Sequence, residues 1–234
     1  MKPRPRTVCI VTGSRAEFGL LRPVMLAVQN HKQLKLQVVA AGAHLLPPAR
    51  TIREVESEFH LAATVPMQRP RESGRIADAA AAGRGISGFA RAFADLKPDW
   101  VVVLGDRIEA FAAAAAASIG GIAVAHIHGG DRAEGIADEA LRHAITKLSH
   151  LHCAASAQSA RRIARMGENP ASIHMTGSPA IDCLRGIKAM SDRDARQLGD
   201  PQAVLLLHPS GLGDDGDAHL ASGITLAIAA AGPE

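Results

Sequence analysis

Carboxylates, three arginines and several histidines gather between residues 99 and 152. Two short apolar segments in this stretch are typical of buried strands, and each ends in charged residues. Gly105-Asp106-Arg107 follows the first segment, and His128-Gly129-Gly130-Asp131 follows the second. Ligands of open parallel sheets bind beyond the carboxyl ends of the strands. We therefore expect Asp106 and Asp131, together with Asp138 at the start of the next helical segment, to line one crevice where proton transfer can occur.

The helical segment 138–149 adds further charge to this crevice. Asp138 and Arg142 are four residues apart, so they share one face of the helix. Arginine in such a place can bind a carboxylate or a phosphate through two hydrogen bonds. Competing explanations are that Asp138 caps the helix and that His143 pairs with Glu139 on the same helix.

Apolar, β-branched segments alternate with helical segments from residue 7 to about residue 187. This alternation predicts an α/β fold, a Rossmann-like, doubly wound parallel sheet with right-handed crossovers. The expected strands cover residues 7–12, 36–41, 64–67, 101–104, 122–127, 151–154 and 172–175. The long helical segment 72–96 contains Gly83, Gly85 and Gly88, which lower helix stability. We expect a kink or a break near Gly83.

The first strand leads through Gly13-Ser14-Arg15 into a helical segment. A glycine turn before a helix suits an anion at the helix N-terminus. However, the turn matches neither the dinucleotide fingerprint nor the P-loop motif. Arg15 is its only cation, and we expect it to bind a carboxylate or phosphate; a surface position without such a role is the alternative.

Composition narrows the class of protein. The chain has 234 residues, 47% of them hydrophobic, with only 3% aromatic residues, no tyrosine and a net charge of +3. Scarce aromatics and scattered basic residues argue against nucleic-acid binding. No apolar stretch is long enough to span a membrane. Cys9, Cys153 and Cys183 share no paired spacing, so we expect free, buried thiols and a cytoplasmic protein.

The chain beyond residue 187 differs from the part before it. Residues 188–201 are polar and typical of a linker, 204–207 are expected to form a strand, and 217–231 a helix. One strand and one helix cannot build a core of their own. We interpret this part as the opening of a second domain or as an appendage on the first.

Five segments together resemble the hydrolysing UDP-N-acetylglucosamine 2-epimerases of the sialic and legionaminic acid pathways. They are GSRAEFGLLRPV (13–24), VLGDRIEA (103–110), AHIHGGD (125–131), DEALRHAITKLSHLH (138–152) and TGSPAID (176–182). The resemblance covers about residues 7–210. It implies a GT-B architecture, in which two Rossmann-like domains hold a sugar nucleotide between them. Residues 1–187 would form the N-terminal domain, 188–201 a linker, and 202–234 the first βα unit of the C-terminal nucleotide-binding domain.

The resemblance also implies a reaction. A base removes the proton from C2 of UDP-N-acetylglucosamine, UDP leaves from C1, and water adds to the resulting 2-acetamidoglucal with inversion at C2. The products are UDP and N-acetylmannosamine, or the matching products of a related acetamido sugar. No cofactor and no metal ion is implied, and the full-length form is expected to be a homo-oligomer.

Several residues match the motifs of the family. Asp106 corresponds to the acid of the Gly-Asp motif, and Asp138 and Arg142 to the Asp and Arg of the helix motif. The remaining substrate-binding candidates are Arg15, Arg107, His143 and, in the His-Pro turn after segment 204–207, His208.

One position departs from the family pattern. Several relatives carry glutamate in an H-x-E-G-G motif, where this chain has His128. Asp131 follows the two glycines. Either His128 transfers the proton or Asp131 substitutes for the missing acid, and the sequence leaves both open.

Two other classes of function compete with the epimerase. His126 and His128, with Asp131 and His152, could form the metal site of a hydrolase, and metal content would distinguish it. The chain could also be a non-catalytic remnant or a binding domain.

Since the family's uridine and diphosphate contacts lie mostly in the C-terminal domain, we expect residues 1–234 alone to fold but to release no appreciable UDP.

Overall fold

The computed structural model describes residues 4–48, 50–132, 138–182, 184–201, 204–207 and 214–231. The chain divides into two compact units, Met1–Arg185 and Gly186–Glu234. The first unit contains the sheet and all the candidate site residues except His208, and each unit is described by itself below.

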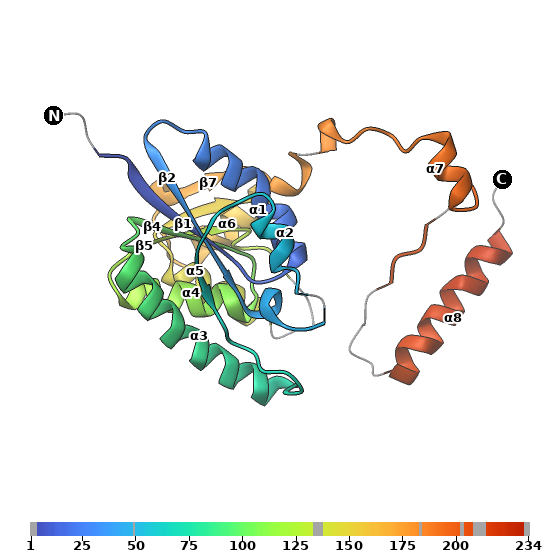
Figure 1. Cartoon of the computed structure of the whole chain (residues 1–234), viewed down its shortest axis with the longest axis horizontal. Helices are drawn as coiled ribbons and strands as arrows, with labels where there is room; N and C mark the ends of the chain where they lie inside the picture. Colours follow the sequence, from blue (N-terminus) through green and yellow to red (C-terminus); the bar gives the residue numbers. More distant parts are fainter. Residues whose placement is uncertain are drawn as a thin grey trace. The chain divides into compact units, whose positions relative to one another are not determined.

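Seven strands of the first unit form one sheet in which every neighbouring pair is parallel. Its spatial order is β3-β2-β1-β4-β5-β6-β7 (Figure 1). The strands are β1 (Arg6–Thr12), β2 (Leu34–Ala41), β3 (Leu61–Val65), β4 (Trp100–Leu104), β5 (Ala123–Ile127), β6 (Leu151–Ala154) and β7 (Ile173–Met175). The chain order reverses between β1 and β4, as in Rossmann-type sheets. The predicted parallel, doubly wound sheet is confirmed.

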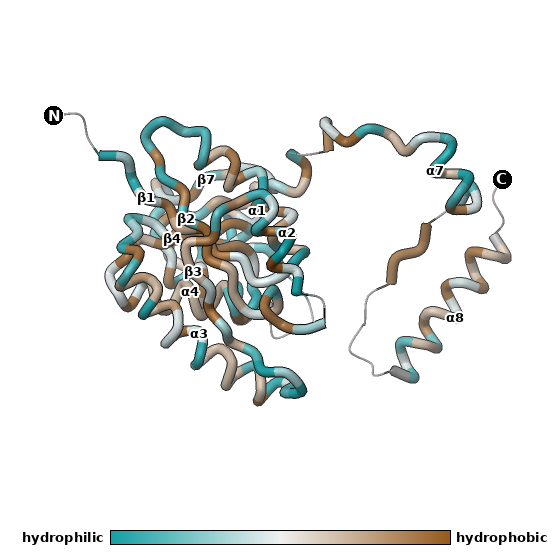
Figure 2. The backbone as a smooth tube through the Cα atoms, in the orientation of Figure 1, coloured by the Kyte–Doolittle hydropathy of each residue, from teal (hydrophilic) through white to brown (hydrophobic). Residues whose placement is uncertain are grey.

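Helices cover both faces of this sheet and create two cores. They are α1 (Arg15–Gln29), α2 (Ile52–Glu56), α3 (Arg75–Leu96), α4 (Ile108–Ile119), α5 (Asp138–Leu148) and α6 (Ala157–Arg165). On one face, α3, α4 and α5 pack against alternate strand residues such as Val11 and Val103. On the other face, α1 and the segment around α2 bury Leu21 and Phe59 against Ile10 and its neighbours. The hydrophobic strands in the interior are visible in Figure 2.

Helix α3 is continuous from Arg75 to Leu96, so the predicted break near Gly83 is wrong. Close packing of the neighbouring elements explains Gly85 and Gly88, whereas a Cβ on Gly83 would meet nothing within 4 Å. A Cβ on Gly85 would lie 2.9 Å from Cβ of Ala112 on α4 and 2.5 Å from Cε of Met67. Tertiary contacts therefore outweigh the low helix propensity of glycine in this segment.

The second unit contains helices α7 (Asp192–Gln197) and α8 (Asp214–Ala231). Residues 204–207 are hydrophobic (Figure 2) but belong to no strand, so the strand predicted there is wrong. Val204 and Leu206 are 85% and 76% exposed. A strand needs a neighbour for its backbone hydrogen bonds, and the described residues offer this segment none.

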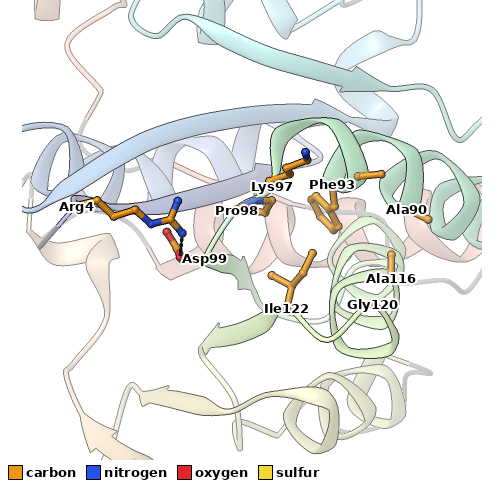
Figure 3. Close-up of a pocket in the computed structure, with 10 residues that line it drawn as sticks. Arg4, Ala90, Phe93, Lys97, Pro98, Asp99, Ala116, Gly120 and Ile122 are labelled. Atoms are coloured by element: carbon orange, nitrogen blue, oxygen red, sulfur yellow. Dashed lines mark hydrogen bonds and ion pairs between the residues drawn. The ribbon is translucent and has the colours of Figure 1, made fainter.

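The amino-terminal edge of the sheet holds a pocket of about 450 Å³ (Figure 3). Asp99, just before β4, accepts a 2.7 Å hydrogen bond from the Thr7 N–H and pairs with Arg4 at 2.9 Å. The Thr7 hydrogen bond, followed by the charge of Arg4, lowers the pKa of Asp99. Asp99 therefore holds Arg4 and Thr7 in place at the amino-terminal ends of the strands. The predicted crevice lies at the other ends, the carboxyl ends.

Two of the three cysteines lie among the described residues. Cys9 is buried and free, and burial raises the pKa of its thiol to about 12. Cys153 is free but only partly buried, and Cys183 lies outside the described residues. Separately, the described part of the chain contains no helix of the length and apolarity that crossing a membrane requires.

Candidate active site

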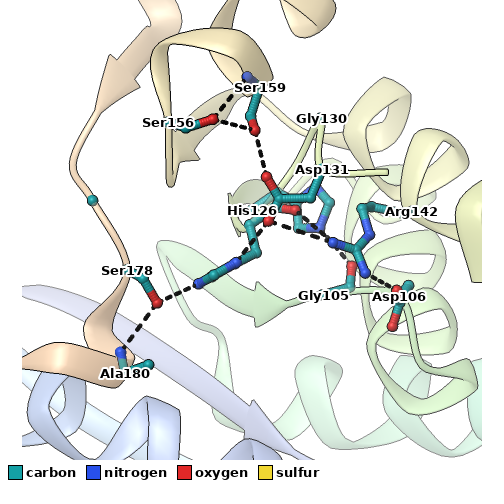
Figure 4. Close-up of polar contacts among 12 residues, drawn as sticks. Gly105, Asp106, His126, Gly130, Asp131, Arg142, Ser156, Ser159, Ser178 and Ala180 are labelled. Carbon is teal, nitrogen blue, oxygen red and sulfur yellow. Dashed lines mark hydrogen bonds and ion pairs between the residues drawn. The ribbon is translucent and has the colours of Figure 1, made fainter. Parts of the chain in front are cut away.

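Four charged or titratable side chains lie together at the carboxyl ends of β4 and β5, next to α5 (Figure 4). We call this group the crevice cluster: Asp106, His128, Asp131 and Arg142. Arg142 pairs with Asp106 through Nη2, and its Nη1 lies 3.5 Å from Oδ2 of Asp131. The structure thus brings Asp106 and Asp131 together at the carboxyl edge of the sheet, where the strand ends predict them to lie. Arg142 links them from a helix that is distant in sequence.

Asp131 is surrounded by hydrogen-bond donors. Its Oδ2 lies 2.8 Å from Nδ1 of His128, and its Oδ1 accepts a hydrogen bond from the Ser159 hydroxyl on α6. Arg142 adds a positive charge beside Oδ2. Asp131 is therefore held in place on both oxygens.

His128 adopts a left-handed backbone conformation with a φ of 65°. For a residue other than glycine this costs about 1–2 kcal/mol. Its N–H donates to the Cys153 carbonyl at 3.1 Å, which stabilises the conformation. The ring bridges Asp131 and Ser178, whose Oγ lies 2.9 Å from Nε2. This unusual backbone geometry turns the side chain toward the crevice.

Gly130, in the same loop, cannot carry a side chain. Its φ is 75°, and an added Cβ would lie 2.4 Å from the Ser159 carbonyl oxygen and 2.8 Å from Cγ1 of Ile163. Arg162 also donates to the Gly130 carbonyl at 2.8 Å. Gly130 thus lets the loop pack directly on α6, which places Asp131 beside Ser159.

His126 has a structural role. It is fully buried, with Nε2 2.7 Å from the Gly105 carbonyl oxygen and Nδ1 3.2 Å from Oγ1 of Thr146. Burial lowers its pKa to about 3, so the ring is neutral. Both ring nitrogens are engaged, which argues against the His-x-His metal site. Among the described residues, no group of three His, Cys, Asp or Glu side chains is placed to hold a metal ion.

A second polar group lies beneath the carboxyl edge and was not predicted. We call it the buried cluster: Glu17, Gln68, Arg107 and Glu109. Glu109 is fully buried and accepts hydrogen bonds from Gln68 at 2.8 Å and from Arg107 Nε at 3.3 Å. The only signal for this cluster in the sequence was Glu109, three residues after Asp106.

Glu17 is the other carboxyl group of the buried cluster. Its Oε2 accepts a 2.7 Å hydrogen bond from the Gly13 N–H, while Oε1 is buried without a partner among the described residues. Burial raises its pKa to about 8; the Gly13 N–H opposes this shift and the nearby charge of Glu109 adds to it. Glu17 is therefore mainly protonated at neutral pH.

Arg107, which was predicted to bind substrate, pairs with Glu109, its Nε lying 3.3 Å from Oε2. Its side chain is 47% exposed, so one part of it faces the solvent. Burial alone would lower its pKa, but the carboxylates of Glu109, Glu17 and Asp106 raise it. Arg107 is thus a cation whose position is set by the buried cluster.

Arg15 and His143 pair with residues outside the crevice cluster. Arg15 is exposed at the start of α1 and pairs with Glu54 at 3.2 Å. His143 lies 3.4 Å from Glu139, the pairing considered as the alternative for it. Asp138 begins α5, but its side chain is outside the described part of the chain, as is the whole of His208. Sequence reasoning missed Ser159 and Ser178, although Ser178 lies in the quoted TGSPAID segment.

The seven parallel strands and the charged crevice at their carboxyl ends define a Rossmann-like α/β protein. Over residues 26–230 the sequence matches the UDP-N-acetylglucosamine 2-epimerase family, and the chain belongs to that family. The resemblance inferred from five short segments is therefore confirmed.

Curated relatives are similar over most of this chain. A GDP/UDP-N,N'-diacetylbacillosamine 2-epimerase (hydrolyzing) from Campylobacter jejuni is 35% identical over 81% of the chain and 49% of its own length. A UDP-N,N'-diacetylbacillosamine 2-epimerase (hydrolyzing) from Legionella pneumophila is 36% identical over 87% and 55%. A UDP-N-acetylglucosamine 2-epimerase from Neisseria meningitidis is 36% identical over 76% and 46%. The chain thus spans about half the length of the curated relatives it matches.

Solved structures agree with the fold. The UDP-GlcNAc 2-epimerase from Neisseria meningitidis bound to UDP-GlcNAc is 28% identical, with a TM-score of 0.68 over 76% of this chain and 48% of its own. Another UDP-N-acetylglucosamine 2-epimerase gives a TM-score of 0.73 at 23% identity, which supports the fold alone. The first unit therefore has the architecture of one half of these GT-B-type enzymes.

Proposed function

We propose that this chain provides the N-terminal, proton-transferring half of a hydrolysing 2-epimerase that acts on a UDP-linked 2-acetamido sugar. The observation that carries the proposal is the crevice cluster, in which two carboxylates and a histidine surround Arg142 at the carboxyl edge of the sheet. The family match and the names of the relatives supply the substrate class.

The chemistry of the reaction accounts for the residues in the cluster. The C2 proton of the sugar is barely acidic, so its removal requires a base that is held in position and shielded from water. Departing UDP carries negative charge that a cation can stabilise. Arg142 supplies the cation, and Asp106 and Asp131 keep it in place. The base is either His128 or Asp131, because this chain has His128 where several relatives have glutamate.

We propose UDP-N-acetylglucosamine as the substrate, with UDP and N-acetylmannosamine as products in a route to sialic acid. The relative from Neisseria meningitidis carries this substrate in its name. The two relatives named for N,N'-diacetylbacillosamine are equally similar in identity, so the related UDP-diacetamido sugar is the alternative. Turnover of the two sugar nucleotides, compared side by side, distinguishes them.

The remaining features of the whole protein are also proposals. Residues 1–187 form the N-terminal domain, 188–201 the linker, and 202–234 the beginning of the C-terminal nucleotide-binding domain, where His208 contacts the nucleotide. The whole protein is a homo-oligomer. The free thiols of Cys9 and Cys153 support a reducing compartment, the cytoplasm.

A chimera tests the proposal. Residues 1–185 of this chain replace the matching half of the Neisseria meningitidis relative, and UDP release is followed in a coupled assay with both sugar nucleotides. We expect release of UDP together with the 2-epimer of the free acetamido sugar. The 234-residue chain serves as the control, with no appreciable release expected. A folded chimera that binds UDP but releases none from either substrate would favour a non-catalytic remnant or binding domain and contradict the proposal.

A further inference from the structure

His128 lies in the middle of a row of hydrogen bonds that starts at a helix end. The Ala180 N–H donates to Oγ of Ser178 at 3.2 Å, Ser178 Oγ lies 2.9 Å from Nε2 of His128, and Nδ1 lies 2.8 Å from Oδ2 of Asp131. An ionised carboxylate can only accept hydrogen bonds. In the neutral ring, Nδ1 therefore carries the proton, and Nε2 is left as an acceptor that receives the Ser178 hydroxyl.

Each end of this row is fixed by the fold. Ser178 caps the short 3-10 helix Pro179–Ile181, which orients its hydroxyl. Asp131 is held on its other oxygen by Ser159 and beside Oδ2 by Arg142. The His128 ring is about one-fifth exposed, so it reaches the crevice without being freely solvated. Ser178, Ser159 and Arg142 belong to three separate segments, which the parallel sheet brings to the loop that carries His128 and Asp131.

These contacts separate the roles of the two candidate bases. Both oxygens of Asp131 already have hydrogen-bond partners, and Oδ2 also lies 3.5 Å from the Arg142 guanidinium, so neither oxygen is without a partner. Nε2 of His128 carries a lone pair whose only partner in the described residues is a neutral hydroxyl. A hydroxyl is easier to displace than a carboxylate-bound cation, because hydrogen bonds to charged groups are the stronger ones.

We propose that His128 takes the C2 proton on Nε2, that Asp131 is a positioning residue that fixes the Nδ1–H tautomer, and that Ser178 occupies Nε2 until substrate replaces it. This inference rests on the proposed function. It decides between the two bases that the sequence left open, and it assigns a role to Ser178. The relation between a histidine base and a buried aspartate that sets its tautomer is well established in other enzymes.

The proton and electron changes balance without any further reactant. The Nε2 lone pair forms a bond to the C2 proton, the C2–H electrons form the C1–C2 double bond, and the C1–O bond breaks with its electrons leaving on UDP. The imidazolium is stabilised by Asp131 and returns its proton to solvent. Water then supplies hydroxide to C1, and a proton is added to C2 from the opposite face of the sugar.

Nitrogen-15 NMR of the histidine rings tests the tautomer in the 234-residue chain itself. We expect neutral His128 to be protonated on Nδ1. Asp131→Asn should shift the neutral ring toward the Nε2–H form, and Ser178→Ala should move the Nε2 resonance while leaving Nδ1 protonated. Thr176→Ala is the matched control, because its hydroxyl lies in the same segment and bonds to Gly177 rather than to the histidine. An Nε2–H tautomer in the unmodified chain would overturn the inference.

The chimera tests the role in turnover. Asp131→Asn and His128→Gln should each lower kcat by about 10²-fold or more, with KM changed less than about threefold. In His128→Gln, the pH profile of turnover should lose the limb that reports deprotonation of the catalytic base. Full kcat in Asp131→Asn, while the unmodified chimera is active, would overturn this inference and leave the proposed function intact. An inactive chimera whose His128 is protonated on Nδ1 would overturn the proposed function, and the proton-transfer role with it.

Discussion

The crevice cluster and the buried cluster lie at the same edge of the sheet but differ in how their charges are balanced. In the crevice cluster Arg142 bridges two carboxylates, and its side chain and that of Asp106 are 14% and 17% exposed. Arg142 thus pairs with both carboxylates of the crevice cluster, although its own Nε is buried without a partner among the described residues. In the buried cluster Glu109 is fully enclosed, and one oxygen of Glu17 has no partner among the described residues. Burial with incomplete pairing changes protonation, as the pKa of about 8 for Glu17 indicates.

The largest expected effect concerns the crevice cluster. In the chimera, Asp106→Asn should lower kcat by about 10²–10⁴-fold, the range for a lost acid or base. Asp138→Asn is expected to behave in the same way. Folding should change little, because asparagine keeps the size of the side chain. Asp99→Asn, at the opposite edge, is the matched control and should retain full turnover. Wild-type turnover in Asp106→Asn would remove this carboxylate from the mechanism.

The buried cluster should control stability instead. The folded state holds a proton on Glu17 up to about pH 8, whereas an unfolded glutamate releases it near its ordinary value of 4.5. The free energy of unfolding should therefore decrease as the pH rises through this window, by a few kcal/mol in total. Glu17→Gln cannot titrate, so it should abolish that part of the decrease. Urea unfolding of both proteins between pH 5 and 8 measures it, and equal slopes would show that Glu17 does not carry the effect.

The loop that carries Asp131 should be sensitive to added volume. Gly130→Ala places a methyl group against the backbone of α6 in a left-handed conformation, and should destabilise the first unit by about 1–3 kcal/mol. Gly83→Ala in α3 is the control: a Cβ there meets nothing within 4 Å, so it should stabilise the helix by about 0.5–1 kcal/mol. Thermal unfolding of the two variants gives the comparison. A neutral Gly130→Ala would mean that the loop does not pack as described.

The smallest effect on stability is expected at Arg15. Its pair with Glu54 is exposed, with side chains 75% and 45% accessible, so Arg15→Ala should change the free energy of unfolding by less than about 0.5 kcal/mol. In the chimera the same variant should raise KM, because we still predict that Arg15 contacts the phosphate. An unchanged KM would assign Arg15 to the surface alone.

The sequence was sufficient for the sheet and for part of the site. Apolar segments predicted all seven strands of the first unit, although β3 begins three residues earlier than expected. The central strands β4 and β5 are buried on both faces, whereas the edge strand β7 is mostly exposed. The carboxyl-edge rule then placed Asp106 and Asp131 together without any knowledge of their contacts. The failures arose where tertiary contacts decide local structure. Gly83 lies in an unbroken helix, and residues 204–207 have a strand-like sequence without a strand to pair with.

The buried cluster shows a different limit. Glu17 and Glu109 are unremarkable in a charged sequence, and only the fold reveals that Gly13 and Gly42 make room for Glu109. A Cβ on Gly42 would lie 2.3 Å from Oε1 of that glutamate. Similarly, the left-handed φ of His128 aims its ring at Ser178, which no periodicity in the sequence indicates.

Deuterium incorporation tests the central claim most directly. The chimera is allowed to turn over UDP-N-acetylglucosamine in deuterium oxide, and the free sugar is analysed by mass spectrometry and NMR. If the crevice cluster supports proton removal from C2, each product molecule should carry one deuterium at C2 with inverted configuration. Release of UDP with the original proton and configuration retained at C2 would show simple hydrolysis at C1 and contradict the account.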